Sequence, residues 1–272
     1  PLASVDFTAF QDRSALLRDV AALLGVLLRL DVVPVHGRWL PLHALRALNP
    51  WLAVPENLAE VRSELGTGRL RWLHYLAVVA GLVEVQGGHL KPTVAAWEWL
   101  SASPADQWAA LMAGVEADLS SRDRTWDVFR FPAVTAASWR VLCDVIAGLS
   151  PAQAYHLRDV LAALKPYLLP EHPAVLAYCV RDMLAWSGVV SLYRGRVGVL
   201  PARFKPVVAL APADPLCFPL PPVASPAWVM LSSFAGIKDG TVTINETSII
   251  TAVERGLTLI FAILMLPAHN LN

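Results

Sequence analysis

The residues whose types and spacing best suit a chemical task are cations that gather around one short glycine turn in the second half of the chain. They are Arg181, Arg194, Arg196, Arg203 and Lys205. Guanidinium and ammonium groups bind phosphate oxygens, and an arginine-bearing hairpin can lie along a nucleic-acid backbone or enter a minor groove. We therefore expect these residues to contact nucleic acid; the alternative is a solvated hairpin tip whose charge serves solubility.

A second set of cations offers weaker candidates for phosphate contacts. They are Arg69, Arg71, Lys91, Arg122 and Arg124. The last two, with Arg130, alternate with Trp126 and Phe129, and such a mixture can form a stacking platform for single strands. The same pattern suits a connection whose aromatic side chains dock on a hydrophobic core. We favour docking.

The sequence lacks the short motifs of common catalytic and metal sites. It contains no GxxxxGK[ST], GxGxxG, HExxH or GxSxG motif, which mark phosphate-binding loops, dinucleotide folds, zinc peptidases and serine hydrolases. No two histidines stand at i, i+4 and no CxxC pair occurs, so a zinc site has no local support. The carboxylates are scattered singly, and we expect them on surface faces. The sequence therefore predicts no catalytic residue, metal ligand or cofactor, and a protein that is not an enzyme.

Composition and charge set bounds on the class of protein. The 272 residues are 56% hydrophobic and 16% charged, which indicates a folded chain with room for two or three modules. The formal net charge is zero, but residues 119–205 carry 11 basic and 6 acidic side chains, an excess that favours an anionic surface. No apolar run reaches the roughly 20 residues that span a bilayer, and the three cysteines are widely spaced. We expect no membrane association and a cytoplasmic location.

One sequence pattern occurs twice, at Arg69–Pro92 and at Leu176–Pro201. Each copy is an apolar helix stopped by a glycine, Gly81 or Gly188, then a short strand, a glycine turn and a second short strand. A helix that leads into a two-stranded ribbon is the back half of a winged helix-turn-helix. The basic residues lie on the second copy, so we expect the first copy to be scaffold or a protein-facing surface.

The periodicity of apolar residues predicts the other elements. In the first module, Ser14 is expected to cap a core helix, and an extended segment, a short helix, a third helix, a wing and two trailing helices follow. The predicted ranges are Ser14–Leu28, Asp31–Leu40, Pro41–Leu48, Arg69–Ala80, Leu82–Leu90, Val94–Leu100 and Pro104–Asp118. In the second module they are helices at Ser138–Leu149, Ala152–Leu164 and Pro173–Trp186, and a wing at Val189–Leu200.

The composition changes after residue 205. Prolines crowd residues 206–226, which excludes a helix and predicts an extended linker. Residues 227–272 predict a small α+β module with a strand at Trp228–Leu231, a hairpin turn at Lys238–Gly240, and helices at Thr247–Arg255 and Leu257–Leu266. The predicted fold is mainly α, with tandem winged helix-turn-helix modules at residues 1–118 and 119–205, short β-wings and a small C-terminal α+β cap.

Several apolar motifs carry a resemblance to a known family. They are Gly81–Val85, Gly88–Thr93, Trp97–Leu100 and Pro104–Leu111, with Thr241–Ile244, Thr247–Ile249 and Glu254–Leu257 near the C-terminus. Together they resemble the helicase-associated winged-helix region of bacterial helicases of the xeroderma pigmentosum group B type. The resemblance implies a DNA-associated accessory region that sits beside a helicase motor. This chain has no motor, so we predict no helicase activity.

The leading hypothesis is a non-enzymatic nucleic-acid-binding accessory protein that acts with a protein partner, such as a helicase or another complex subunit. Double-stranded DNA is favoured over single-stranded DNA. The alternative is a structural subunit whose winged helices bind other proteins. The zero net charge and the tryptophan content favour this alternative, because exposed aromatic side chains are common binding anchors. Trp97 and Trp99 fall on different faces of one helix, which would leave one of them available to a partner.

Overall fold

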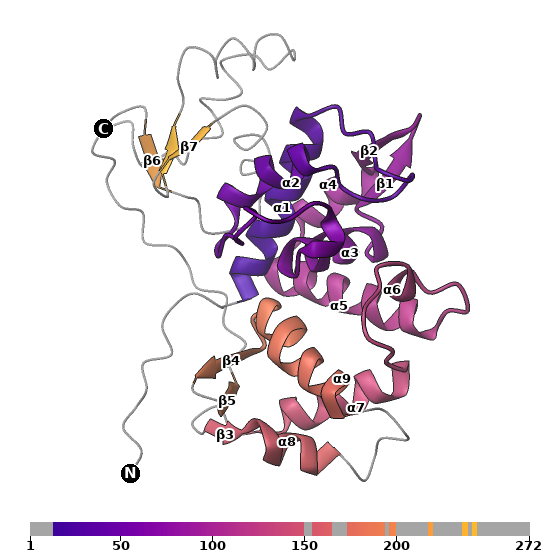
Figure 1. Ribbon diagram of the computed structural model, residues 1–272, viewed down its shortest axis with the longest axis vertical. Helices are drawn as coiled ribbons and strands as arrows, with labels where there is room; N and C mark the ends of the chain where they lie inside the picture. Colours follow the sequence, from indigo (N-terminus) through magenta and orange to yellow (C-terminus); the bar gives the residue numbers. More distant parts are fainter. Residues whose placement is uncertain are drawn as a thin grey trace.

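The computed structural model describes residues 13–149, 154–164, 173–193, 196–199, 217–219, 236–238 and 241–243, and Figure 1 shows their arrangement. Within these ranges the chain is mainly helical, with short antiparallel strands, as the sequence predicts. None of the described helices is long and apolar enough to cross a membrane.

Helix α1 (Arg13–Arg29) is surrounded by the other helices of the first half of the chain. Nearly every side chain from Ser14 to Leu27 is buried, because α1 is apolar around most of its circumference and contacts α2, α3, α5 and β2. The predicted cap at Ser14 is wrong. The helix already includes Arg13, and Ser14 is buried within its first turn.

The segment after α1 is extended, as predicted. The carbonyl of Val32 accepts a 2.8 Å hydrogen bond from the N–H of Leu90, and Val35 pairs with Trp39 across a tight turn. The helices that follow in this half are α2 (Leu42–Leu48), η1 (Asn49–Trp51), η2 (Glu64–Gly66), α3 (Arg69–Val79), α4 (Val94–Ser101), α5 (Pro104–Ser120) and α6 (Thr125–Val128).

The first predicted wing is a hairpin of β1 (Val83–Gln86) and β2 (His89–Pro92). Gly87 and Gly88 connect the strands with φ of 57° and 85°, and two successive positive φ angles form the turn whose twist matches that of antiparallel strands. The hydrogen bond from β2 to Val32 puts β2 between β1 and the extended segment. The strand predictions for this region are confirmed.

The second half begins with α7 (Ala136–Ala147), whose N-terminus is capped by the hydroxyl of Thr135. The elements after it are β3 (Ala154–His156), α8 (Leu157–Leu164), α9 (Pro173–Tyr178), its π-helical continuation η4 (Cys179–Leu184), β4 (Val190–Tyr193) and β5 (Arg196–Val199). The strands form one antiparallel sheet in the order β3-β5-β4. In Figure 1 this sheet and the β1–β2 hairpin lie at opposite ends of the helical part.

The helix predicted at Ala152–Leu164 is wrong in its first part. Ala154–His156 form strand β3, and α8 begins only at Leu157. The apolar spacing that buries Val160 and Leu164 starts at Leu157, so the helical pattern does not extend to the residues before it. Pairing with β5, far along the chain, turns those residues into a strand.

One hydrophobic core runs through both halves, from Leu16 to Val197. Its centre is a group of buried aromatic rings, in which Trp72 lies 6.0 Å from Trp126 and 5.7 Å from Phe131, measured between ring centroids. Burial of Trp126 confirms that the aromatic residues after α5 dock on the core and do not form an exposed stacking platform.

Near the C-terminus the described residues form a second three-stranded sheet. Strands β7 (Gly236–Lys238) and β8 (Thr241–Thr243) pair as the predicted hairpin, and β6 (Cys217–Pro219) pairs with the other edge of β8. Strand β6 falls inside the predicted linker, so that segment is not only a connection; proline is tolerated at the end of such an edge strand. The predicted strand at Trp228–Leu231 and the two predicted C-terminal helices lie outside the described residues.

Candidate nucleic-acid interface

The second hairpin follows directly from the helix before it. Gly188 has a φ of 69°, and the N–H of Val189 donates a 2.9 Å hydrogen bond to the carbonyl of Leu184, which closes the helix in a left-handed turn. Val190, at the base of the hairpin, and Val197, next to Arg196 on β5, are both buried. These contacts anchor the two strands to the end of the helix.

The predicted phosphate contacts near this hairpin are described only in part. Arg196 is the first residue of β5 and is in register with Tyr193 on β4 and His156 on β3. Arg194, Arg203 and Lys205 lie outside the described residues.

Arg181 is on the surface of η4, with its side chain 59% exposed. Its guanidinium donates to the carboxylate of the adjacent Asp182 at 2.7 Å, and this hydrogen bond raises the pKa of Arg181. Because the neighbouring carboxylate offsets its charge, Arg181 is a weak candidate for a phosphate contact.

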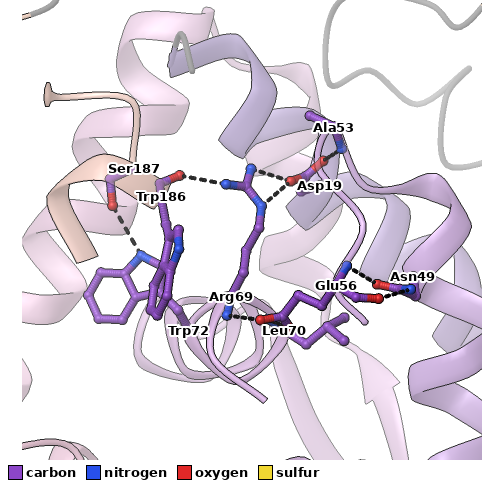
Figure 2. Close-up of polar contacts among 9 residues, drawn as sticks. All are labelled: Asp19, Asn49, Ala53, Glu56, Arg69, Leu70, Trp72, Trp186 and Ser187. Carbon is purple, nitrogen blue, oxygen red and sulfur yellow. Dashed lines mark hydrogen bonds and ion pairs between the residues drawn. The ribbon is translucent and has the colours of Figure 1, made fainter. Parts of the chain in front are cut away.

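Arg69 is not a surface residue, and its prediction as a phosphate contact is wrong. It is 4% exposed, and its Nε lies 2.9 Å from Oδ2 of Asp19, with a second contact from Nη2. Figure 2 shows the guanidinium between Asp19 and the carbonyl of Trp186, which accepts a 3.4 Å hydrogen bond. Asp19 lies 50 positions away in the sequence, so local spacing does not indicate this pairing.

The other secondary candidates divide into two groups. Arg71 lies 4.8 Å from the ring centre of Phe131, and Arg124 donates to the carbonyl of Val134, so both are partly buried and engaged with the fold. Lys91 on β2 and Arg122 after α5 are exposed. Of the predicted secondary contacts, these last two remain on the surface.

Helix α3 is covered on nearly all sides. Trp72 to Ala77 are all buried, and the indole N–H of Trp72 donates to the hydroxyl of Ser187 at 3.0 Å. At the start of the helix, Gly68 faces Trp186 so closely that a Cβ there would lie 2.9 Å from the indole ring. The end of the second repeated helix therefore covers the start of the first, and α3 cannot enter a groove of DNA.

A distant carboxylate caps α3. Oε1 of Glu56 accepts hydrogen bonds from the N–H groups of Gly68 and Arg69, both at 2.9 Å, and Oε2 accepts from Leu70 at 3.1 Å. Asn49 holds the backbone of Glu56 through two hydrogen bonds of 2.8 and 2.9 Å. The carboxylate satisfies N–H groups that a helix leaves unpaired and offsets the positive end of its dipole.

Two further carboxylates, expected on the surface, are also buried and hydrogen-bonded. Glu64 contacts Nδ1 of His74 at 2.7 Å and accepts the N–H of Leu40 at 2.5 Å. Asp118 accepts N–H groups at the start of α6 and the hydroxyl of Tyr75 at 3.0 Å. Burial, and then this carboxylate, raise the pKa of Tyr75. The expectation of surface carboxylates is wrong for these residues, because polar groups far apart in sequence meet inside the core.

Among the described residues, no three histidine, cysteine or carboxylate side chains come together in a group that could hold a metal ion. Cys143 is a half-buried free thiol, and burial raises its pKa to about 12. A thiol of this kind is protonated near neutral pH and is a poor nucleophile.

Comparisons with protein-family models, with curated proteins and with solved structures find no match to this chain. A functional proposal therefore depends on the arrangement of its own residues.

Proposed function

We propose that the chain is a non-enzymatic nucleic-acid-binding accessory protein built on two tandem winged helix-turn-helix modules. The order of elements in the second half supports this: helix α7, strand β3, helices α8 and α9, then the hairpin β4–β5, with strand order β3-β5-β4. A winged helix has this order, with the last strand in the middle of its sheet. The first half repeats it with α1, the Val32 segment, α2, α3, β1 and β2.

The observation that carries the proposal is the attachment of the β4–β5 hairpin to the end of the preceding helix, with Arg196 opening β5 directly after the turn. Arg194, Arg203 and Lys205 are close to it along the chain. A hairpin wing with several cations can contact the phosphate backbone without reading base edges. The first module serves as scaffold in this proposal, because α3 is buried.

The wing, and not the helix, makes the principal contact in this proposal. Arg181 is the cation on the exposed side of η4, and Asp182 already accepts its hydrogen bonds. Base readout needs several polar side chains on one exposed helix face. The protein is therefore expected to bind duplex DNA with little sequence preference.

A salt titration of duplex binding tests the proposal. Four phosphate contacts by the wing cations predict a log–log slope of roughly −3 to −4. Arg194→Glu combined with Arg196→Glu should abolish retention on DNA at low salt. Arg46→Glu combined with Arg62→Glu, which reverses two exposed charges in the first half, is the matched control and should retain binding. Absence of binding at low salt, or a slope near zero, would remove the proposal.

A second candidate function is a structural subunit that binds another protein through α4. Val94 is 77% exposed and Trp97, one turn later, is 39% exposed, whereas Trp99 is 5% exposed. Of the two tryptophans, Trp97 is therefore the one at the surface, which supports this candidate. A pull-down from the native host, with and without nuclease, separates the two candidates. A structural subunit should keep its protein partner after nuclease treatment and in the Arg194→Glu, Arg196→Glu variant. It should lose that partner in the Trp97→Ala variant.

A further inference from the structure

An open cleft of about 440 Å³ lies between the turn after α1 and the end of α6. Its lining combines basic, aromatic and acidic side chains. They are His36, Arg38, Trp39, Asp127, Val128 and Arg130. None of these belongs to the repeated helix-and-wing pattern, and the proposed contact of the second wing does not use them.

Both walls of the cleft are fixed to the fold. The turn is closed by hydrogen bonds between Val35 and Trp39, at 2.8 and 3.0 Å. The ring of Trp39 meets the edge of Phe129 with centroids 5.0 Å apart, and Phe129 is buried in the core directly after α6. The cleft is therefore a formed surface feature, and its side chains extend from backbone that is held in place.

The backbone conformation at two lining residues favours glycine, but the chain has long side chains there. Across the described residues, the non-glycine positions with positive φ are His36 at 52° and Arg130 at 54°. One lies in the tight turn and the other just beyond α6, where glycine is the residue with the lowest conformational cost. Such outliers gather at functional sites. Here both side chains line the same cleft.

The charges in the cleft favour an anion. Arg38 and Arg130 are exposed, and within the described part of the chain neither forms an ion pair, in contrast to Arg69, Arg140 and Arg181. Asp127 carries the opposite charge, so the two arginines and this carboxylate together have a formal charge of one positive unit. The imidazole of His36 adds an N–H donor.

We propose that this cleft binds a phosphate group. A guanidinium has a planar set of N–H donors that matches phosphate oxygens, and two guanidinium groups from opposite walls can hold one phosphate between them. The group could belong to a nucleic-acid backbone or to a small phosphate compound. Because a small compound is one possible source, the inference does not depend on the function proposed for the second wing. Salt screens the attraction between the guanidinium groups and the phosphate, so the binding weakens as salt is added. The carboxylate of Asp127 reduces that attraction.

The test follows the indole N–H signal of Trp39 in ¹H–¹⁵N spectra, assigned by its loss in Trp39→Phe. Inorganic pyrophosphate and a short DNA duplex are titrated separately. One of these probes is expected to shift the Trp39 signal. Arg38→Gln combined with Arg130→Gln should weaken the binding of that probe at least tenfold. Arg46→Gln combined with Arg62→Gln removes the same charge from exposed arginines outside the cleft. The affinity of this control variant for the probe should stay within twofold of the wild type.

A single substitution separates loss of the site from loss of the fold. Arg130→Gly removes a guanidinium but suits a φ of 54°, so the melting temperature should stay the same or rise while binding weakens. A shift with pyrophosphate alone assigns a small phosphate compound, and a shift with DNA alone assigns the nucleic-acid backbone. The proposal is overturned if neither probe shifts the Trp39 signal, or if the double glutamine variant binds as tightly as the wild type.

Discussion

Replacing Asp19 by leucine is expected to destabilise the fold strongly. Its carboxylate accepts hydrogen bonds from Nε of Arg69 and from the N–H of Ala53, both at 2.9 Å, and Asp19 and Arg69 are buried. Asp19→Leu would leave the guanidinium buried without a counter-charge. Removal of one partner of a buried pair costs about 3–5 kcal/mol, a large part of the roughly 5–15 kcal/mol by which a typical domain is stable.

The double variant Asp19→Leu, Arg69→Met should recover most of this loss. Apolar side chains of similar volume often replace a buried ion pair without cost. The remaining penalties are the unpaired N–H of Ala53, about 1–3 kcal/mol, and the loss of the long hydrogen bond to the carbonyl of Trp186. The two single substitutions should therefore sum to more than the double. This non-additivity distinguishes a paired buried charge from two independent packing contacts.

Urea unfolding, followed by tryptophan fluorescence and far-UV circular dichroism, measures these changes. Arg140→Met is the control, because its ion pair with Glu116 is exposed and surface pairs contribute little to stability. The reasoning is refuted if Asp19→Leu unfolds at the wild-type urea concentration, or if the double variant loses as much stability as the two single variants added together.

Two further predictions concern the contact between the repeated helices and the chemistry of the half-buried Cys143 thiol. Gly68→Ala puts a Cβ 2.9 Å from the Trp186 ring and should lower the free energy of unfolding by about 1–3 kcal/mol. Gly66→Ala is the matched control, because a Cβ there would lie 3.7 Å from its nearest neighbour. Equal urea midpoints for the two variants would contradict the clash. Burial raises the pKa of Cys143 to about 12 from an ordinary 9.0, so iodoacetamide should react at pH 8 far more slowly with this thiol in the native chain than in urea. Because the folded pKa is the higher one, the stabilisation linked to this thiol is complete below pH 9 and is lost as the pH rises toward 12. Rapid labelling of Cys143 in the native protein at pH 8 would contradict the raised pKa.

Local sequence patterns predicted most of the helices and hairpins. Ser103 before Pro104 predicted the start of α5, and its hydroxyl accepts the N–H of Asp106 at 3.2 Å. The glycines after α3 and η4 predicted where each helix turns into a strand. These predictions succeed because capping and left-handed turns depend on a few adjacent residues.

Strands that depend on distant partners were not predicted. The sequence pattern predicts a helix at Ala154–His156, but these residues form a strand by pairing with β5. It predicts a linker at Cys217–Pro219, but these residues pair with β8. In both cases the hydrogen bonds that define the strand come from a segment far along the chain, and no local pattern in either segment indicates them.

The sequence did not predict the cleft lined by Arg38 and Arg130 either. Arg38 and Arg130 are far apart in the sequence, and neither belongs to a motif. A histidine before a glycine, and an arginine where a short helix ends, are weak local signals of a positive φ. Only their approach across the Trp39–Phe129 contact assembles the cleft.

The sequence by itself determined the helical class, the two helix-and-hairpin repeats and the basic character of the middle segment. The tertiary structure decided which charged residues face solvent. Arg69 and Arg38 are the same residue type, but Asp19 reaches one inside the core and no carboxylate pairs with the other among the described residues. Burial and pairing depend on which segments meet in space, and a charged side chain can enter the core only where folding brings it an opposite charge.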